Sequence, residues 1–429
     1  MTVTAPDIQD SLEARFAASM GAILGPDFPP HLALAVSGGG DSMAMLALAH
    51  GWARVMGIGL HVVTIDHGLR AASAAEAAMV AAECAALGHP HATLHWHWDG
   101  TGNLQDAARS ARLRLIEDWR GDIDHVLFAH TLDDQAETLL MRLVRGSGVE
   151  GLSAMAPLRR AQGMGFWQVR PLLDISRADL RHYARTLRLP FVDDPSNDDP
   201  RFDRVRARRA LAALADLGLT AQGLAESAKR MDRAREALAL RAAAVARTLV
   251  LQDDPVTGQL VFDRDRLAAV ERDTQLRCLA AALQWVGGAP YRPRASALDG
   301  LLDRILGGAG GTLIGTQVAV GPASLRLFRE HAAVRDHVTP TGPDDLWDGR
   351  WRLHGPAVAG LAIRALGPSG WAQLPEKPDN APPFEAALGL PAVFDGETLI
   401  ACAPLGFGPA HDCTLLRPAA SFVAFLQLR

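Results

Sequence analysis

The chain has 429 residues, a net charge of −5, 48% apolar residues and 21% charged residues. This length exceeds what one hydrophobic core supports, so we expect two or three domains. No apolar run is long enough to cross a membrane, and the start lacks a secretion signal, which predicts a cytoplasmic protein. The cysteines are scattered, at Cys84, Cys278, Cys402 and Cys413, so neither a zinc site nor a disulfide framework is indicated.

A strand, a glycine-rich turn and a helix follow one another between residues 32 and 52. The apolar run Leu32–Val36 predicts a buried strand, and Met43–Trp52 has the apolar spacing of a helix. The residues between these elements are Ser37, Gly38, Gly39, Gly40, Asp41 and Ser42. Glycine lets a ligand approach the backbone, and the first N–H groups of a helix lack partners within it, so this segment suits a phosphate. A ligand-free turn is the alternative, and the missing Gly-Lys-Ser/Thr ending excludes a Walker loop.

Strands and helices alternate from residue 30 to about residue 190. Further strands are expected at 62–65, 93–98 and 126–129, and helices at 74–87, 104–119 and 133–145. This order predicts an α/β fold in which helices cover both faces of a doubly wound parallel sheet. Ligands of such sheets bind beyond the carboxyl ends of the strands. We therefore expect the glycine-rich turn, Asp66 and His130, which each follow a strand, to line one crevice.

The remainder of the chain predicts two further regions. A turn-rich segment at 191–200 is followed by five arginines between residues 201 and 209. Helices are expected at 221–249, 274–285 and 295–306, strands at 312–320 and 324–328, and a linker at 339–345. We expect a first domain at residues 1–215, a mostly helical domain at 216–338 and a small β-containing domain at 346–429.

Several strings in a fixed order resemble the tRNA(Ile)-lysidine synthetases, a branch of the ATP-pyrophosphatase (PP-loop) superfamily. These strings are Ser37–Ser42, Asp66–Arg70, Asn103-Leu104 with Arg109 and Arg112, Ala129–Thr138, Arg145–Gly148, Gly151-Leu152, Arg170–Leu173 and Asp194–Asn197. The resemblance covers residues 30–210, and an ordered series is more specific than any one of its members. Two positions depart from the family pattern: Thr131 replaces the second His of a His-His pair, and Val205 replaces an Asn.

The resemblance implies an adenine nucleotide alpha hydrolase-like fold and a ligase that forms a carbon–nitrogen bond. Such an enzyme uses ATP and Mg²⁺ to adenylate the C2 oxygen of cytidine 34 in tRNA(Ile) with a CAU anticodon. L-lysine then displaces AMP, which changes codon reading from AUG to AUA. The domains after residue 215 would contact the tRNA. The resemblance does not decide between a monomer and a homodimer.

The resemblance also implies roles for individual residues. ATP would be bound by Ser37, Gly38, Gly39, Gly40, Asp41, Ser42 and Asp66, with Asp41 as the metal ligand. The catalytic residues would be Asp41, Arg112, His130, Asp133, Asp134 and Glu137. The tRNA backbone would be contacted by Arg201, Arg204 and Arg206.

The chemistry of these residues leaves several roles open. Asp133 and Glu137 project on one helix face, where they suit the cationic lysine, a second Mg²⁺ or a proton from the amine. An acidic first helical turn stabilised by the helix dipole is the alternative. His130 suits a phosphate, the cytidine or a buried core position, and Arg112 suits the AMP phosphate, the tRNA backbone or solvent. Asp66 suits a ribose, adenine or metal contact, or a turn, and the arginines after residue 200 also suit a solvated helix face.

Three other functions compete with this interpretation. A tRNA cytidine thiolase normally needs paired cysteines or an iron–sulfur cluster, and the sequence has no Cys-x-x-Cys. An amide-forming relative needs an ammonia source, often a glutaminase with a nucleophilic cysteine. A non-catalytic tRNA-binding protein is disfavoured by the intact acids Asp41, Asp133, Asp134 and Glu137.

Overall fold

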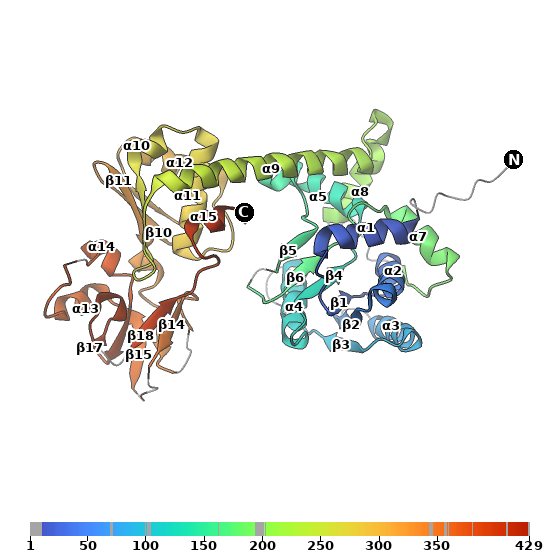
Figure 1. The fold of residues 1–429 in the computed structure, drawn as a ribbon, viewed down its shortest axis with the longest axis horizontal. Coiled ribbons are helices and arrows are strands. Elements are labelled where there is room, and N and C mark those ends of the chain that lie inside the picture. The colour runs from blue at the N-terminus through green and yellow to red at the C-terminus, as the bar shows by residue number, and fades with distance from the viewer. Residues whose placement is uncertain are drawn as a thin grey trace. The chain divides into compact units, whose positions relative to one another are not determined.

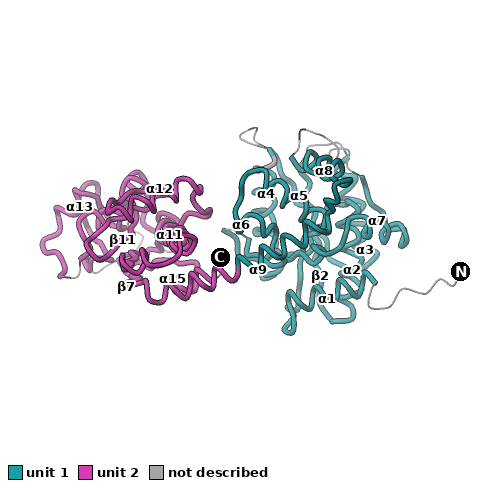
Figure 2. Tube along the Cα trace, turned by 90° about the horizontal axis from the view of Figure 1, so that it is seen from above, with its two compact units in different colours: residues 1–235 teal, residues 236–429 magenta. Residues whose placement is uncertain are grey.

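The computed structural model describes residues 11–68, 72–98, 100, 104–161, 163–193, 201, 203–342, 346–355, 358, 360–379, 381–408 and 411–427. The chain divides into two compact units, Met1–Arg235 and Glu236–Arg429 (Figure 2). The division falls within the long helix α9 (Ala221–Leu249), whose bounds match the expected helix. The three-domain division expected from the sequence is finer than these two units and stays a prediction.

The first unit is built on a six-stranded sheet with the strand order β3-β2-β1-β4-β6-β5 (Figure 1). All neighbouring strands are parallel except β5, which pairs antiparallel with β6 at the edge. The strands are β1 (His31–Ala35), β2 (Gly59–Asp66), β3 (His91–His95), β4 (His125–Phe128), β5 (Leu158–Arg160) and β6 (Trp167–Val169). The predicted α/β fold with a parallel, doubly wound sheet is therefore confirmed, and β5 is an antiparallel addition to it.

Helices cover both faces of this sheet because its central strands are apolar on both sides. Leu32 and Leu34 of β1 pack into one core with α1, α2, α3 and α7, whereas Ala33 packs into a second core with α4. The helices of this unit are α1 (Leu12–Leu24), α2 (Gly40–Met56), α3 (Ser73–Leu87), α4 (Leu104–Trp119), α5 (Leu132–Val144), α6 (Val149–Leu152), α7 (Arg177–Thr186), α8 (Asp203–Ala213) and the first part of α9. Burying one such leucine contributes about 1.5–3 kcal/mol, so the two cores hold the strand ends in fixed positions.

The strand order reverses next to β1. From β1 the chain proceeds to β2 and β3 on one side, and it then crosses to β4 on the other side of β1. The connections that leave β1 and β4 therefore diverge and open a crevice at the carboxyl ends of these strands. The glycine-rich segment follows β1 and His130 follows β4, so the topology brings both segments to this crevice.

The second unit holds an antiparallel five-stranded sheet of order β7-β8-β11-β10-β9. Its strands are β7 (Val250–Asp253), β8 (Leu260–Asp263), β9 (Gly311–Leu313), β10 (Thr316–Val320) and β11 (Ser324–Arg329). Its helices are α10 (Arg264–Ala268), α11 (Arg272–Gly287) and α12 (Ala295–Leu306). The expected single strand at 312–320 is a hairpin, because Gly315 adopts a positive φ of 70° and turns the chain between β9 and β10.

Two smaller antiparallel sheets follow, of orders β12-β15-β16-β17 and β13-β14-β18, around a separate core. Their strands are β12 (Thr339–Pro340), β13 (Leu346–Trp347), β14 (Trp351–His354), β15 (Leu361–Ala365), β16 (Pro391–Asp395), β17 (Thr398–Ala401) and β18 (Asp412–Leu415), with α13 (Gly367–Gln373) and α14 (Phe384–Ala387) beside them. The last helix, α15 (Phe422–Gln427), leaves these sheets. It packs Phe422 and Phe425 into the core formed by α9, α11 and the five-stranded sheet.

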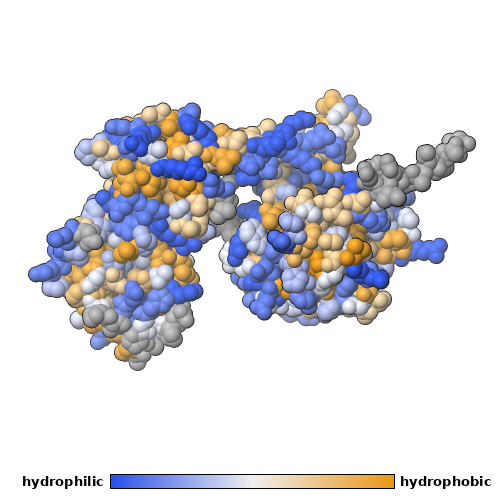
Figure 3. Space-filling model, in the orientation of Figure 1, coloured by the Kyte–Doolittle hydropathy of each residue, from blue (hydrophilic) through white to orange (hydrophobic). Residues whose placement is uncertain are grey.

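Within the described residues, no helix is both long enough and apolar enough to cross a membrane. The face of the molecule in Figure 3 mixes hydrophilic and hydrophobic residues.

Candidate functional site

The glycine-rich segment forms the turn from β1 into α2. Gly39 is the N-cap of α2, no side chain caps the first turn, and Asp41 lies in that turn. The hydroxyl of Ser42 donates to the carbonyl of Gly39 at 2.9 Å and accepts from the N–H of Ser37 at 3.2 Å, which closes the loop on itself. The uncapped N–H groups of α2 are thus left available to an anion at the end of β1.

A distant segment of the chain supports this loop from outside. The N–H of Val192 donates to the carbonyl of Gly38 at 3.0 Å, and Phe191 lies 3.5 Å from where a Cβ on Gly40 would stand. Gly38 has a φ of +84°, and a Cβ there would lie 3.3 Å from the methyl carbon of Met79. A side chain at residue 38 would therefore both strain the backbone and crowd α3.

The four acidic residues predicted for catalysis meet at one arginine, Arg177, at the start of α7. Its guanidinium donates to Asp41 at 3.1 Å, to Asp134 at 3.2 Å and to Glu137 at 3.3 Å. Its backbone N–H donates to Asp133 at 2.7 Å. The expectation that Asp133 and Glu137 face the same way is thus consistent with their contacts, because both reach the same residue from α5.

Burial and charge act against each other in this cluster. Burial raises the pKa of Asp41, and Arg177 opposes this rise only in part. Burial also raises the pKa of Asp134, but the charges of Arg177, His130 and Arg204 and the hydrogen bond from Thr131 together outweigh it and hold this pKa below its usual value. The carboxylates raise the pKa of Arg177 despite its burial, so its guanidinium stays charged. The side chain of Glu137 is 1% exposed, and its Oε2 has no hydrogen-bond partner among the described residues.

Thr131, which departs from the family pattern, caps helix α5. Its hydroxyl accepts from the N–H of Asp134 at 3.3 Å, and the Asp134 carboxylate accepts in return from the N–H of Thr131 at 2.8 Å. This reciprocal capping box fixes the first turn of α5. Asp134 therefore shapes the helix as well as the cluster.

His130 lies between the acids and a group of arginines. Burial lowers the pKa of its imidazole to about 3, and the charges of Arg170, Arg204 and Arg112 add to this effect against that of Asp134. The ring is neutral at neutral pH, and its Nδ1 has no hydrogen-bond partner within the described part of the chain. A neutral ring with a free nitrogen suits a hydrogen bond to a base better than it suits a phosphate.

The arginines beside His130 repel one another. Burial, and then the charges of Arg159, Arg109 and Arg142, lower the pKa of Arg170 to about 10. Arg170 is 4% exposed and donates to the carbonyl of Ala156 and to the side chain of Gln168, which are neutral acceptors. A concentration of guanidinium groups that lower one another's pKa favours binding of an anion at this face of the unit.

The arginines predicted to bind tRNA lie at the start of α8 and just before it. Arg201 is exposed. Arg204 turns toward the acids, with its guanidinium 3.6 Å from Asp134. Arg206 pairs with the exposed Asp203. These positions differ in what they can offer to a phosphate, because Arg204 already has a buried carboxylate partner.

Asp66 ends β2 and stabilises the turn that follows. Its carboxylate accepts from the N–H of Gly68 at 2.8 Å and lies 3.6 Å from the ring of His95. The hydrogen bond from Ser73 contributes most to lowering the pKa of Asp66. These contacts are those of a turn residue, and its predicted contact to ATP stays a prediction.

Some residues of the sequence motifs lie outside the part of the chain that the structure describes. They are Leu69, Arg70, Asn103 and the segment 194–200. Val205 is described, and it is buried in α8 at 6% exposure.

Arg177 is the contact of the acids that the sequence analysis missed, and Arg208 is one of the five arginines after residue 200 that were expected to face tRNA phosphates or solvent. Arg208 donates to Glu137 at 3.0 Å from α8. Arg177 follows Ser176, which caps α7, and this Ser-Arg start of a helix directly after the string Arg170–Leu173 was the available signal. A serine cap followed by an arginine indicates where a helix begins, but it does not indicate that the arginine contacts three carboxylates.

The cysteines do not have the character of nucleophiles. Burial raises the pKa of Cys84 to about 11 and those of Cys278 and Cys402 to about 12, so all three thiols stay protonated. A thiolate is the reactive form, so these residues do not suit the chemistry of a thiolase or a glutaminase.

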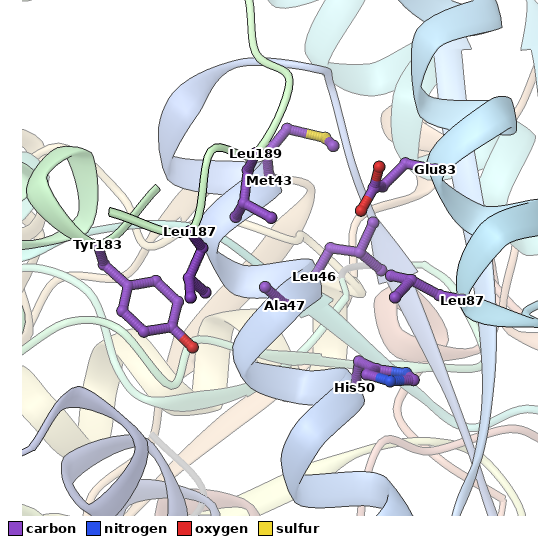
Figure 4. A pocket seen from close by; sticks show the side chains of 9 residues that line it. All are labelled: Met43, Leu46, Ala47, His50, Glu83, Leu87, Tyr183, Leu187 and Leu189. Atoms are coloured by element: carbon purple, nitrogen blue, oxygen red, sulfur yellow. The ribbon is translucent and has the colours of Figure 1, made fainter. Parts of the chain in front are cut away.

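A cleft of about 300 Å³ lies elsewhere on the first unit (Figure 4). It is lined by Met43, Leu46, Ala47, His50, Glu83, Leu87, Tyr183, Leu187 and Leu189, from α2, α3 and the region of α7. None of the residues predicted to bind ATP or to act in catalysis lines it. The predicted site residues therefore lie at the ends of β1 and β4 and not in this cleft.

The chain is similar to several known proteins. The PP-loop domain family matches residues 12–215. The tRNA(Ile)-lysidine synthase of Ruegeria pomeroyi is 42% identical over 429 residues, which cover 99% of each chain. The tRNA(Ile)-lysidine synthase of a Bradyrhizobium species is 42% identical over 296 residues, which cover 66% of this chain and 82% of that protein. Among solved structures, the U34-tRNA thiolase NcsA from Methanococcus maripaludis matches 50% of this chain and 78% of its own, with 17% identity and a TM-score of 0.43. The full-length similarity to the first of these relatives shows that the chain belongs to the tRNA(Ile)-lysidine synthase family, whose first half is an ATP-binding PP-loop domain.

Proposed function

We propose that this chain joins L-lysine to C2 of cytidine 34 in the CAU anticodon of tRNA(Ile), with ATP as the energy source. The C2 oxygen attacks the α-phosphorus of ATP, the bond between the α and β phosphates breaks, and pyrophosphate leaves. The neutral ε-amine of lysine then attacks C2, the C2–O bond breaks, and AMP leaves. The observation that carries this proposal is the carboxylate cluster around Arg177, which includes Asp41 in the first turn of α2.

The uncapped start of α2 supports the part of the site assigned to ATP. The backbone N–H groups of Gly38, Gly39 and Gly40 are suited to stabilise the charge that develops on the departing pyrophosphate. Among the described residues, no group of three or more His, Cys, Asp or Glu side chains forms a metal site on its own. Asp41, partly exposed at the start of α2, therefore fits an Mg²⁺ that is shared with phosphate oxygens and water, which would neutralise that charge.

Asp134 and Glu137 are assigned to the lysine ε-ammonium group. Glu137 is buried and its Oε2 has no hydrogen-bond partner among the described residues, so this oxygen is suited to accept a hydrogen bond from an incoming ammonium group. The ammonium must lose a proton before its nitrogen can attack, and a carboxylate within hydrogen-bond reach is suited to accept that proton. This assignment favours lysine over a second Mg²⁺ at these acids.

The arginine-rich side of the crevice is assigned to the tRNA. The neutral ring of His130 is suited to hydrogen-bond the cytidine, which must leave its stack to reach the crevice. Arg112 is half-buried and has no ion-pair partner among the described residues, so it suits the AMP phosphate or the RNA backbone. Arg201 and Arg206 are assigned to the backbone of the same tRNA, and the regions at 216–338 and 346–429 to its identity elements.

All reacting groups in this proposal come from one chain, so a homodimer is not required for it. The cytoplasm stays the expected location, because tRNA is the substrate.

Lysine incorporation tests the proposed function directly. The purified chain is incubated with ATP, Mg²⁺, radiolabelled lysine and tRNA(Ile) bearing CAU, with tRNA(Met), which shares this anticodon, as the control. Label is expected in tRNA(Ile) alone, together with one AMP and one pyrophosphate for each lysine. Pyrophosphate release without any label in tRNA would contradict the proposal.

A further inference from the structure

Arg177 is in direct contact with both halves of the site. Its Nε donates to Asp41 beside the phosphate loop, and its two terminal nitrogens donate to Asp134 and Glu137. Its side chain is 20% exposed, so solvent reaches part of it.

The three carboxylates that contact the guanidinium of Arg177 are already matched by arginines. Asp133 contacts the backbone N–H of Arg177 and is not counted among them. Asp41, Asp134 and Glu137 supply three negative charges, and Arg177 supplies one positive charge among them. The remaining two are matched at the rim by Arg204, 3.6 Å from Asp134, and by a second α8 arginine, 3.0 Å from Glu137. A further cation that enters this cluster must displace one that is present, because adding charge to buried carboxylates that are already matched is costly.

We propose that Arg177 is a positioning residue that holds the place of the lysine ammonium group and is exchanged for it when lysine binds. The guanidinium keeps Asp134 and Glu137 together and charged until lysine arrives. When the ammonium takes these two acids, Arg177 keeps its contact with Asp41 and stays beside the phosphate loop. There its charge is suited to stabilise departing pyrophosphate. This inference rests on the proposed function, since it takes lysine as the incoming cation.

The exchange predicts opposite effects on lysine binding and on turnover. Lysine can bind Asp134 and Glu137 only when Arg177 has left them. If Arg177 occupies these acids most of the time, the apparent affinity for lysine falls in proportion to the fraction of molecules in which they are free. Arg177→Gln is therefore expected to bind lysine about tenfold more tightly, in proportion to the fraction released. The same variant loses a cation beside the loop and is expected to release pyrophosphate about tenfold to 100-fold more slowly.

The experiment uses the full chain with three substitutions: Arg177→Gln, Arg177→Lys and Arg185→Gln. Arg185 is exposed on the same helix, away from the cluster, and serves as the matched control. Lysine binding is measured by calorimetry, and kcat and KM for lysine are measured by incorporation into tRNA(Ile). Thermal unfolding of each variant reports whether it folds, and Arg177→Lys keeps the charge if Arg177→Gln does not fold.

The expected result is a lower lysine Kd and a lower kcat in Arg177→Gln, with both values moved back toward those of the unmodified chain in Arg177→Lys. Methylguanidinium should compete with lysine in Arg177→Gln only. An unchanged or weaker lysine affinity in a folded Arg177→Gln would overturn the exchange. Failure of the unmodified chain to incorporate lysine would instead overturn the proposed function, so the two failures are distinguishable.

Discussion

Asp134 serves two structures with its two oxygens. Its Oδ2 accepts from the N–H and the hydroxyl of Thr131 in the capping box, and its Oδ1 accepts from Arg177. A carboxylate that accepts from a backbone N–H cannot rotate freely. The capping box therefore also fixes Oδ1 of Asp134 in the position where it contacts Arg177. One side chain therefore serves both the cap of helix α5 and the proposed lysine site.

Asp41→Asn is expected to slow pyrophosphate release by about 100-fold or more, because the loop loses the carboxylate suited to hold Mg²⁺ against the phosphates. Its affinity for tRNA should stay nearly unchanged. Both quantities are measured on the full chain, with Asp216→Asn, an exposed position in the turn before α9, as the control. Normal pyrophosphate release in Asp41→Asn would remove the metal role.

His130 is expected to make stability depend on pH. Burial lowers its pKa to about 3 in the folded chain, whereas the unfolded value is about 6.5. Between these values the unfolded chain binds a proton that the folded chain does not, so the free energy of unfolding falls as pH drops below about 6.5. His130→Asn should reduce this fall by up to about 1.4 kcal/mol per pH unit.

Urea denaturation at pH 7, 6 and 5 measures this slope. His182→Asn, at an exposed position on α7, is the control. An identical slope in His130→Asn and in the unmodified chain would show that His130 is not held neutral by the fold.

Helix α5 brings Asp133, Asp134 and Glu137 to the cluster because of where it begins. Its first turn is fixed by the capping box, and its far side packs through Ala136 and Leu139 against α9. The position of each acid is therefore set by the helix as a rigid element, with one cap at the crevice and one apolar face behind it.

Thr131→Ala is expected to lower the free energy of unfolding by about 1–2 kcal/mol, the cost of a lost N-cap. Thr131→Ser keeps the hydroxyl and should restore most of it. Chemical denaturation measures both variants. The same Ala variant frees the Asp134 carboxylate, so KM for lysine should rise; equal KM values for the Ala and Ser variants would argue against a shared role of cap and site.

The whole molecule carries a net charge of −5, yet its first unit gathers arginines on one face. Arg142 and Arg170 both have a pKa below the usual value, chiefly through burial and then through neighbouring guanidinium groups that include Arg159. Net charge therefore says little about nucleic-acid binding here, because the positive groups are concentrated locally.

Arg159→Gln is expected to weaken tRNA binding and to reduce the slope of log Kd against log salt by about 0.7–0.9, the value of one phosphate contact. Arg206→Gln should have a smaller effect, since Asp203 already pairs with this arginine. Filter binding at several salt concentrations measures both. If Arg159→Gln does not change the slope of log Kd against log salt, this face does not bind tRNA phosphates.

Phe422→Ala is expected to destabilise the second unit by about 3–5 kcal/mol, because a fully buried ring near the end of the chain would leave a cavity. Phe422 is 1% exposed and lies 5.5 Å from Phe262 of β8, ring centre to ring centre. Thermal unfolding measures the loss, with the partly exposed Val423→Ala as the control. Equal stability of both variants would contradict the role of α15 in this core.

The sequence by itself determined the parallel sheet, its order of strands and helices, and the glycine-rich turn into α2. Periodicity and turn residues are local, and the bounds of α4, α9 and α12 agree with the expected ranges for that reason. The β strands of the second unit were harder to predict, because β7 and β8 are short and β8 gains its second partner from β11, more than 60 residues later.

Only the tertiary structure decided how the site is assembled. Arg177 stands 136 residues after Asp41 and 43 residues after Asp134, and no spacing rule connects positions that far apart. The neutral state of His130 likewise depends on burial and on arginines from other elements. The acids of α5 could be predicted from the sequence because they lie within one helical turn of each other. Their cation, Arg177, could not, because only tertiary packing brings α7 against α2 and α5.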